Sequence, residues 1–195
     1  MNKRVFIIHG WTGNPREPML WWLKVNLEKS GQEVFTPEMP ETDTPKIESW
    51  VGKLKEVVEP DLNTILVGHS IGCQAVVRFI ETLPQGAKIT GVVLIAPWME
   101  LDAKTMEEEG EDGIEIAKPW VETPINFEKV KSHIGKTVAI FSDDDPYVPI
   151  ASQRDLFKKE LNAEIITEHN KGHFAPSDNI TELPSALNAI LEMTQ

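Results

Sequence analysis

The chain has 195 residues, of which 41% are apolar, enough for one well-filled core and too few for two independent domains. Its net charge of −12 repels phosphate backbones and anionic lipids, which argues against nucleic-acid and membrane partners. A single cysteine, Cys73, excludes an intrachain disulfide. The basic N-terminus is followed by only four apolar residues, far short of a signal-peptide core, and no later segment approaches the length of a membrane span. We therefore expect one cytoplasmic domain over residues 1–195.

Short β-branched runs alternate with helical patterns along the chain, which is typical of βαβ units and a parallel sheet. Six such runs are recognisable, at residues 5–8, 33–35, 64–67, 91–95, 137–141 and 164–167. Apolar residues keep helical spacing in three further segments, at residues 47–58, 73–80 and 183–191. In the last of these, Pro184 suits the first turn of a helix. The pattern predicts six strands with helices between them.

One connection between strands is longer than the others. Residues 97–124 exceed the usual length of a connection and are a candidate lid or insertion. Within residues 100–115, eight acidic residues and one lysine give a local charge of −7. Two interpretations stay open, a solvated acidic loop or a cap that excludes water or selects cationic substrates.

One serine lies between two glycines at the end of the third run. Gly68-His69-Ser70-Ile71-Gly72 fits the pattern G-x-S-x-G, although three small residues alone are weak evidence. The motif follows a strand of buried type and opens a helix. That setting suits a nucleophile elbow, because small neighbours allow a sharp turn that exposes the serine oxygen. We therefore favour a nucleophilic Ser70 over a turn serine.

A nucleophilic serine needs a base to accept its proton and a carboxylate to orient that base. The stretch "SDDDPYVP" follows the fifth run, and "EHNKGHFAP" follows the sixth. The chain order Ser, Asp, His is that of α/β-hydrolases. Among the three aspartates we favour Asp145, because it directly precedes Pro146 and lies four residues before Pro149, where the chain leaves the strand end. Its two neighbours suit a polar turn.

Two histidines compete for the role of base. His173 follows Gly172 in a loop beyond the last strand, where a flexible turn can bring the imidazole over the sheet edge. His169 is the alternative. A zinc site that uses both is disfavoured, because "HNKGH" contains a glycine and no evident helix. We predict His173 as the base and no metal.

Two backbone amides are candidates for binding a developing oxyanion. Gly10 lets the backbone pass close to a ligand, so the amide of Trp11 can point at the charge. The amide of Ile71 lies at the positive end of the helix after the elbow. His9 and His69 are interpreted as structural residues that fix the loops beside the site.

Three tryptophans lie in predicted loops beside the strand ends. Trp11, Trp98 and Trp120 together indicate an apolar, aromatic pocket for the acyl or leaving group, with Trp98 and Trp120 as candidate pocket residues. The alternative is that each tryptophan covers core.

These stretches together resemble a known family, the small α/β-hydrolases of the YdeN-like and retinoblastoma-binding-protein-9-like group of serine hydrolases. The resemblance is carried by "IIHGWTGNP", "WWLKVNLEKSG", "LVGHSIGCQAVVRFIE", "SDDDPYVP" and "GHF". It implies nucleophile, acid and base at Ser70, Asp145 and His173, a sheet shorter than in full-sized hydrolases, and cleavage of esters or amides. The acidic run "EEEGEDG" departs from the family, whereas "KPW" resembles one of its motifs.

The expected fold is a minimal α/β-hydrolase with a six-stranded, mostly parallel sheet in the order 2-1-3-4-5-6 and helices on both faces. The expected activity is hydrolysis of a small ester or amide through an acyl-enzyme, with no cofactor. Two alternatives remain, a binding protein of weak activity on the same scaffold and an acyltransferase that uses the same residues. No protein partner is inferred.

Overall fold

The computed structural model describes residues 3–102, 104 and 110–195, and its centre is a parallel sheet. Six strands lie in the order β2-β1-β3-β4-β5-β6, and every adjacent pair is parallel. The strands are β1 (Arg4–Ile8), β2 (Glu33–Phe35), β3 (Thr64–His69), β4 (Ile89–Ile95), β5 (Ile134–Ser142) and β6 (Glu164–Glu168). The predicted strand order is confirmed.

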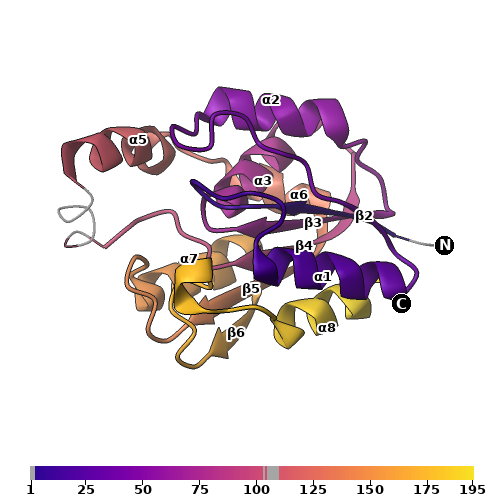
Figure 1. Cartoon of the computed structure of the whole chain (residues 1–195). Helices are drawn as coiled ribbons and strands as arrows, with labels where there is room; N and C mark the ends of the chain where they lie inside the picture. The colour runs from indigo at the N-terminus through magenta and orange to yellow at the C-terminus, as the bar shows by residue number, and fades with distance from the viewer. Residues whose placement is uncertain (1–2, 103, 105–109) are drawn as a thin grey trace.

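Helices cover both faces of this sheet, as Figure 1 shows. One face carries α2 (Ile47–Val57), α3 (Ile71–Glu81), α6 (Phe127–His133) and α7 (Ile150–Leu161), and the other carries α1 (Pro18–Lys29) and α8 (Pro184–Met193). Successive side chains of a strand point to opposite faces. In β1, Phe6 and Ile8 therefore pack with the first helix layer, whereas Val5 and Ile7 pack with the second. A proline at the first turn begins both α1 and α8, as predicted for Pro184.

Two glycines allow α3 to pack closely against the central strands. A Cβ atom on Gly68 would lie 2.6 Å from the amide nitrogen of Cys73, and one on Gly72 would lie 2.6 Å from the carbonyl oxygens of Ile8 and His9. Both contacts involve backbone, which cannot give way as a flexible side chain can. The small residues of the motif therefore bring the N-terminus of α3 against the carboxyl ends of β1 and β3.

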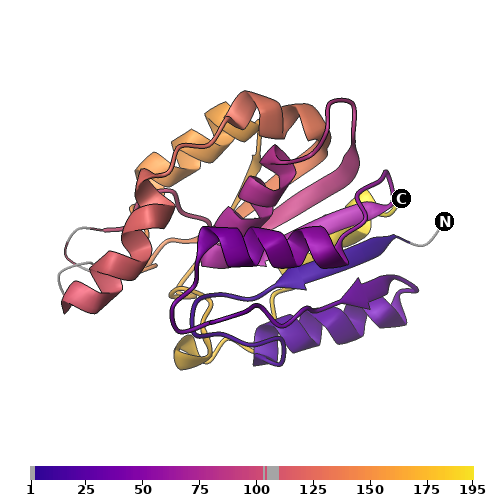
Figure 2. The same ribbon diagram turned by 90° about the horizontal axis from the view of Figure 1, so that it is seen from above.

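The long connection after β4 contributes helix α5 (Gly110–Glu122), which lies beyond the carboxyl ends of the strands (Figures 1 and 2). Its C-terminal end is tied to the core, because the Trp120 indole donates to the carbonyl of Pro45 at 2.9 Å. In addition, the Arg78 guanidinium donates to the carbonyls of Trp120 and Thr123, each at 2.8 Å. Part of the predicted acidic segment, residues 103 and 105–109, lies outside the described residues.

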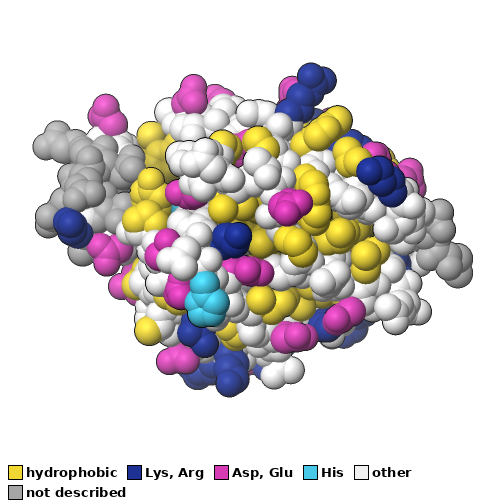
Figure 3. All heavy atoms as spheres, turned by 60° about the horizontal axis from the view of Figure 1, so that its bottom comes forward, with side chains coloured by type: hydrophobic (Ala, Val, Ile, Leu, Met, Phe, Trp, Pro, Cys, Tyr) yellow, Lys and Arg dark blue, Asp and Glu magenta, His cyan; other side chains and the backbone are white. Residues whose placement is uncertain are grey.

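The face formed by α1 and α8 comes forward in Figure 3 and carries hydrophobic side chains among charged ones. Trp21 of α1 is the most exposed tryptophan in the described part, at 44%. No helix among the described residues is long and apolar enough to cross a membrane.

Candidate active site

Ser70 lies at a strained turn between β3 and α3. Its φ of 53° and ψ of −125° fall where a residue with a side chain is rarely found, at a typical cost of about 1–3 kcal/mol. The turn is held because the Ser70 amide donates to the Ile95 carbonyl at 2.9 Å, and the Cys73 amide donates to the Ser70 carbonyl at 2.9 Å. Such strain needs support from its surroundings, and here it holds the serine hydroxyl at the edge of the sheet.

The structure brings Ser70, Asp145 and His173 together from three separate loops. His173 Nε2 lies 2.8 Å from Ser70 Oγ, and His173 Nδ1 lies 2.8 Å from Asp145 Oδ2. Both side chains of the His173 and Asp145 pair are largely buried, with 11% and 2% exposed. The imidazole thus bridges a hydroxyl and a carboxylate, each within hydrogen-bond distance.

Asp145 is fixed by the turn that leads into α7. Its other oxygen, Oδ1, accepts from the amides of Tyr147 at 2.9 Å and Val148 at 3.3 Å. The Tyr147 ring packs edge-on against the His173 ring, with 5.0 Å between centroids. The carboxylate and the imidazole are therefore held by separate contacts as well as by each other.

The loop that carries His173 is held by Asp178, a residue that the sequence reasoning missed. Asp178 Oδ2 accepts from the amides of His173 and Ala175, each at 2.9 Å. The same carboxylate lies against Gly172, where a Cβ atom would come within 2.4 Å of the Asp178 Cγ. The signal in the sequence was the aspartate just after "GHFAPS", which suits a residue that satisfies loop amides.

The competing aspartates and His169 are exposed, and in the described structure their hydrogen bonds reach the loop that carries His173 rather than Ser70. Asp143 accepts from the Asn170 amide and pairs with His169, and these contacts lower the pKa of Asp143 while the same pair raises the pKa of His169. Asp144 accepts from the Ser142 hydroxyl and from the Gly172 amide. Their contacts fit positioning roles.

The two predicted oxyanion donors lie near the serine. A Cβ atom on Gly10 would be 3.3 Å from the Ser70 Cβ, so the chain just before Trp11 passes beside Ser70. The Trp11 amide makes no hydrogen bond within the described part of the chain. Ile71 is the first residue of α3, where the amide has no partner within the helix. Both amides can therefore serve a ligand.

A family model described as "Serine hydrolase" matches residues 5–192. The chain belongs to the serine hydrolase family. Among curated proteins, YdeN of Bacillus subtilis (strain 168) is 28% identical over 186 residues, which cover 94% of this chain and 92% of YdeN. "Serine hydrolase RBBP9" of Rattus norvegicus is 25% identical over 167 residues, covering 85% and 78%.

Solved structures of other hydrolases share the fold of this serine hydrolase. The crystal structure of the ydeN gene product from B. subtilis superposes with a TM-score of 0.86 at 25% sequence identity, over 98% of each chain. Est1E from Butyrivibrio proteoclasticus superposes with a TM-score of 0.68 at 17% identity, over 98% of this chain and 88% of Est1E. The expected family and fold are confirmed.

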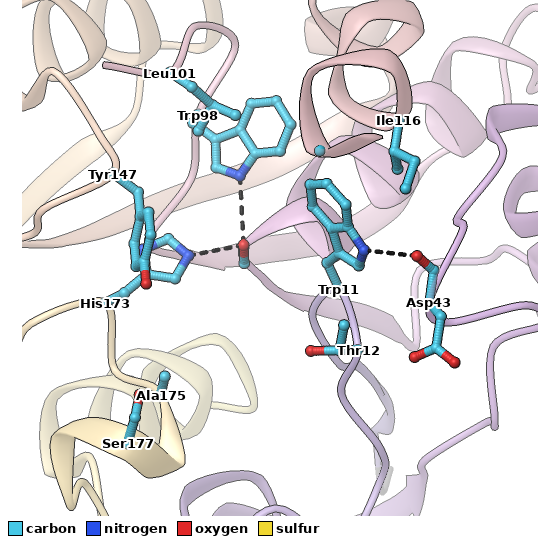
Figure 4. Close-up of a pocket in the computed structure, with 12 residues that line it drawn as sticks. Trp11, Thr12, Asp43, Trp98, Leu101, Ile116, Tyr147, His173, Ala175 and Ser177 are labelled. Atoms are coloured by element: carbon cyan, nitrogen blue, oxygen red, sulfur yellow. Dashed lines mark hydrogen bonds between the residues drawn. The ribbon is translucent and has the colours of Figure 1, made fainter. Parts of the chain in front are cut away.

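A cavity of about 470 Å³ opens on the serine of this hydrolase (Figure 4). Large apolar or aromatic side chains form much of its wall: Trp11, Trp98, Leu101, Ile116 and Tyr147. Of the two predicted pocket tryptophans, Trp98 is therefore in the wall. Trp120 is outside it and lies in the core, with its ring 6.0 Å from that of Trp50.

A second hollow of about 340 Å³ adjoins the first and also reaches Ser70 and His173. Its wall includes Asn14 and Glu17. Burial raises the pKa of the Glu17 carboxyl, which accepts from the Asn14 amide. The serine thus lies between an apolar space and a more polar one.

The two remaining histidines near the site hold loops, in keeping with the structural roles predicted for them. His9 Nδ1 lies 2.9 Å from the Gly10 carbonyl oxygen, and His9 Nε2 accepts from the Met39 amide at 3.2 Å. His69 Nε2 lies 2.8 Å from the carbonyl oxygen of His173, so this nitrogen carries the proton. His69 Nδ1 is buried and has no hydrogen-bond partner in the described structure.

We predict that His69 makes the folded state less stable in acid. Burial lowers the pKa of His69 from 6.5 to about 4, and the neighbouring His173 adds to the shift. As pH falls below 6.5, the unfolded chain binds a proton at His69 that the folded chain does not, so the free energy of unfolding falls. The expected loss between pH 6.5 and 4 is on the order of 3 kcal/mol.

Urea unfolding of the wild type and of His69→Gln across this pH range measures the effect. A glutamine cannot titrate, so the difference in stability between the two proteins should shrink or reverse as pH falls. Carboxyl groups elsewhere titrate in both proteins and cancel in the comparison. Parallel pH profiles for the two proteins would contradict the prediction.

Proposed function

We propose that this serine hydrolase cleaves a small ester or amide through a covalent acyl-enzyme on Ser70. The proposal rests above all on one observation, that the two ring nitrogens of His173 lie 2.8 Å from Ser70 Oγ and 2.8 Å from Asp145 Oδ2. A serine hydroxyl is a weak nucleophile at neutral pH, and an imidazole at this distance can accept its proton.

In the proposed mechanism, Ser70 Oγ attacks the substrate carbonyl while its proton moves to His173 Nε2. Asp145 holds the imidazole in the required tautomer and stabilises the imidazolium that forms. The amides of Trp11 and Ile71 donate to the carbonyl oxygen as it becomes negative. His173 then returns the proton to the leaving group, and water releases the acyl group by the same steps.

The shape and lining of the larger cavity support an apolar substrate group. A space of about 470 Å³ is large enough for a small organic molecule, and Trp11, Trp98 and Tyr147 offer ring faces. We propose that this space takes an aromatic acyl or leaving group. We also propose that the protein is a single cytoplasmic domain, and that the described part of residues 97–124 forms a cap over the site. Gly113 and Ile116 of α5 contribute to the wall from that segment.

We predict that aromatic esters are better substrates than short aliphatic ones. For p-nitrophenyl phenylacetate against p-nitrophenyl acetate, kcat/KM should be higher by about 10-fold or more, because the ring adds buried apolar area in the transition state. Initial rates over a range of concentrations give both values, with subtraction of the rate in buffer.

Equal kcat/KM values for the two esters would count against an aromatic acyl group in this space, because both esters carry the same p-nitrophenyl leaving group. The wider proposal fails separately: if the folded protein hydrolyses neither these esters nor the matching anilides, a binding role on the hydrolase scaffold becomes the better account.

A further inference from the structure

Ser70 Oγ has a second polar neighbour besides His173. The indole Nε1 of Trp98 lies 3.4 Å from Ser70 Oγ, at the long end of hydrogen-bond distance. Figure 4 shows the Trp98 and His173 rings reaching the serine oxygen from different sides. A residue that merely walls a cavity has no need to direct its N–H at the nucleophile.

The position of Trp98 is fixed by its surroundings. Its side chain is buried, with 2% exposed, and the following amide, that of Met99, donates to Gln153 Oε1 at 2.7 Å. Gln153 is itself buried in α7. Upstream, the Ala96 amide donates to the Ile140 carbonyl at 2.9 Å. The main chain is therefore held on both sides of Trp98, and burial of the side chain fixes the indole beside the serine.

A buried indole N–H usually finds an acceptor, and in the described structure the acceptor that it reaches is Ser70 Oγ. The indole N–H can only donate, whereas an ionised carboxylate can only accept. Trp98 and Asp145 therefore fix which atom donates and which accepts in each hydrogen bond of the chain between them. Ser70 accepts from Trp98 and donates to His173 Nε2, and His173 Nδ1 donates to Asp145.

We propose that Trp98 is a catalytic residue whose indole N–H directs the Ser70 proton to His173 and stabilises the charge on Oγ during attack. The inference rests on the proposed function. As the Oγ–H bond breaks, its proton moves to His173 Nε2, and the Oγ electron pair forms the bond to the carbonyl carbon. The carbonyl π electrons move to the carbonyl oxygen, and Trp98 keeps its own proton throughout.

The same donor also acts when the acyl-enzyme breaks down. Oγ then leaves the acyl carbon and regains negative charge before His173 returns its proton. Hydrogen bonds to charged oxygens are about twice as strong as those to neutral ones, so the 3.4 Å contact strengthens at the moment of reaction. The hydrogen bond from Trp98 therefore accelerates acylation and deacylation and leaves the affinity for the substrate unchanged.

The sharpest test removes the N–H and keeps the ring. We expect replacement of Trp98 by β-(3-benzothienyl)alanine, which has sulfur in place of N–H, to slow single-turnover acylation at saturating p-nitrophenyl ester by about 10- to 100-fold. The half-saturating concentration should stay within about 2-fold. Trp98→Phe should show a loss of similar size.

Trp50→Phe is the matched control. Trp50 is also fully buried, and its indole donates to the Pro40 carbonyl at 2.8 Å. The control therefore loses a tryptophan and an indole hydrogen bond without touching Ser70, and its acylation rate constant should remain within about 2-fold of the wild-type value. An equal loss in the control would show a general structural effect and overturn the proposal.

Two further results would also overturn it. One is a benzothienyl variant that acylates at the wild-type rate. The other is a variant whose half-saturating concentration rises while its rate constant at saturation equals that of the wild type. That result would show that Trp98 only lines the cavity and contributes to substrate binding. These results can be told apart from failure of the proposed function, because in that case the wild type itself would show no acylation that depends on Ser70.

Discussion

Ser70→Ala is expected to lower kcat for ester hydrolysis by about 10⁶-fold, the scale seen when the nucleophile of a serine protease is removed. The reason is that, in the described part of the chain, the hydroxyl that lies within hydrogen-bond distance of His173 Nε2 is that of Ser70, and the nearby thiol of Cys73 is buried and donates to the Gly68 carbonyl. Burial raises the pKa of that thiol further above neutrality. Steady-state hydrolysis of p-nitrophenyl esters by purified protein measures the loss.

The matched control for this variant is Ser152→Ala. Ser152 lies in the first turn of α7, where its hydroxyl donates to the Pro149 carbonyl, and it does not line the cavity. The control should keep kcat within about 2-fold of the wild type. Hydrolysis by Ser70→Ala at the wild-type rate, in a preparation free of other esterases, would remove Ser70 from the mechanism.

Asp145→Asn is expected to lower kcat by about 10⁴-fold, as replacement of the equivalent carboxylate does in a serine protease. An asparagine fits the same space, but its NH₂ group donates where the carboxylate accepted. That change favours the His173 tautomer with the proton on Nε2, which cannot take the proton of Ser70. The variant should fold, and the loss should appear in kcat more than in KM.

Asp143→Asn and Asp144→Asn separate the acid from its neighbours. Both side chains hold the loop that carries His173, through Asn170 for Asp143 and through Gly172 for Asp144. An asparagine oxygen can accept the same amide hydrogen bonds, so each variant should lose less than about 10-fold in kcat. A 10⁴-fold loss in either variant, with Asp145→Asn active, would show that the acid was assigned wrongly.

The strands could be predicted well from the sequence because buried parallel strands are rich in β-branched residues. The residues at which the strands begin and end could not be predicted in the same way. The fifth run was predicted over residues 137–141, whereas β5 extends over Ile134–Ser142. Ile134 pairs with Ile89 and Lys136 pairs with Gly91 on β4, so the neighbouring strand extends β5 across Gly135 and Lys136, two residue types that are uncommon in strands.

The candidate site could be predicted where residues close in sequence indicate how the chain turns. Asp145 was chosen from three adjacent aspartates because prolines show where the chain turns away from the strand. Trp98 and Trp120 could not be separated in this way. Both are loop or helix tryptophans of one long segment, and only tertiary packing sends one indole to Ser70 and the other to the Pro45 carbonyl.

The catalytic role of Ser70 is tested most directly by intact mass after treatment with a fluorophosphonate, which phosphonylates activated serines. We predict one adduct on the wild type and none on Ser70→Ala, because in the proposed mechanism His173 and Asp145 activate this one hydroxyl. An adduct on both proteins would show that the reactive residue lies elsewhere. No adduct on folded wild-type protein would contradict a catalytic Ser70, and a binding role on the hydrolase scaffold would then be the better explanation.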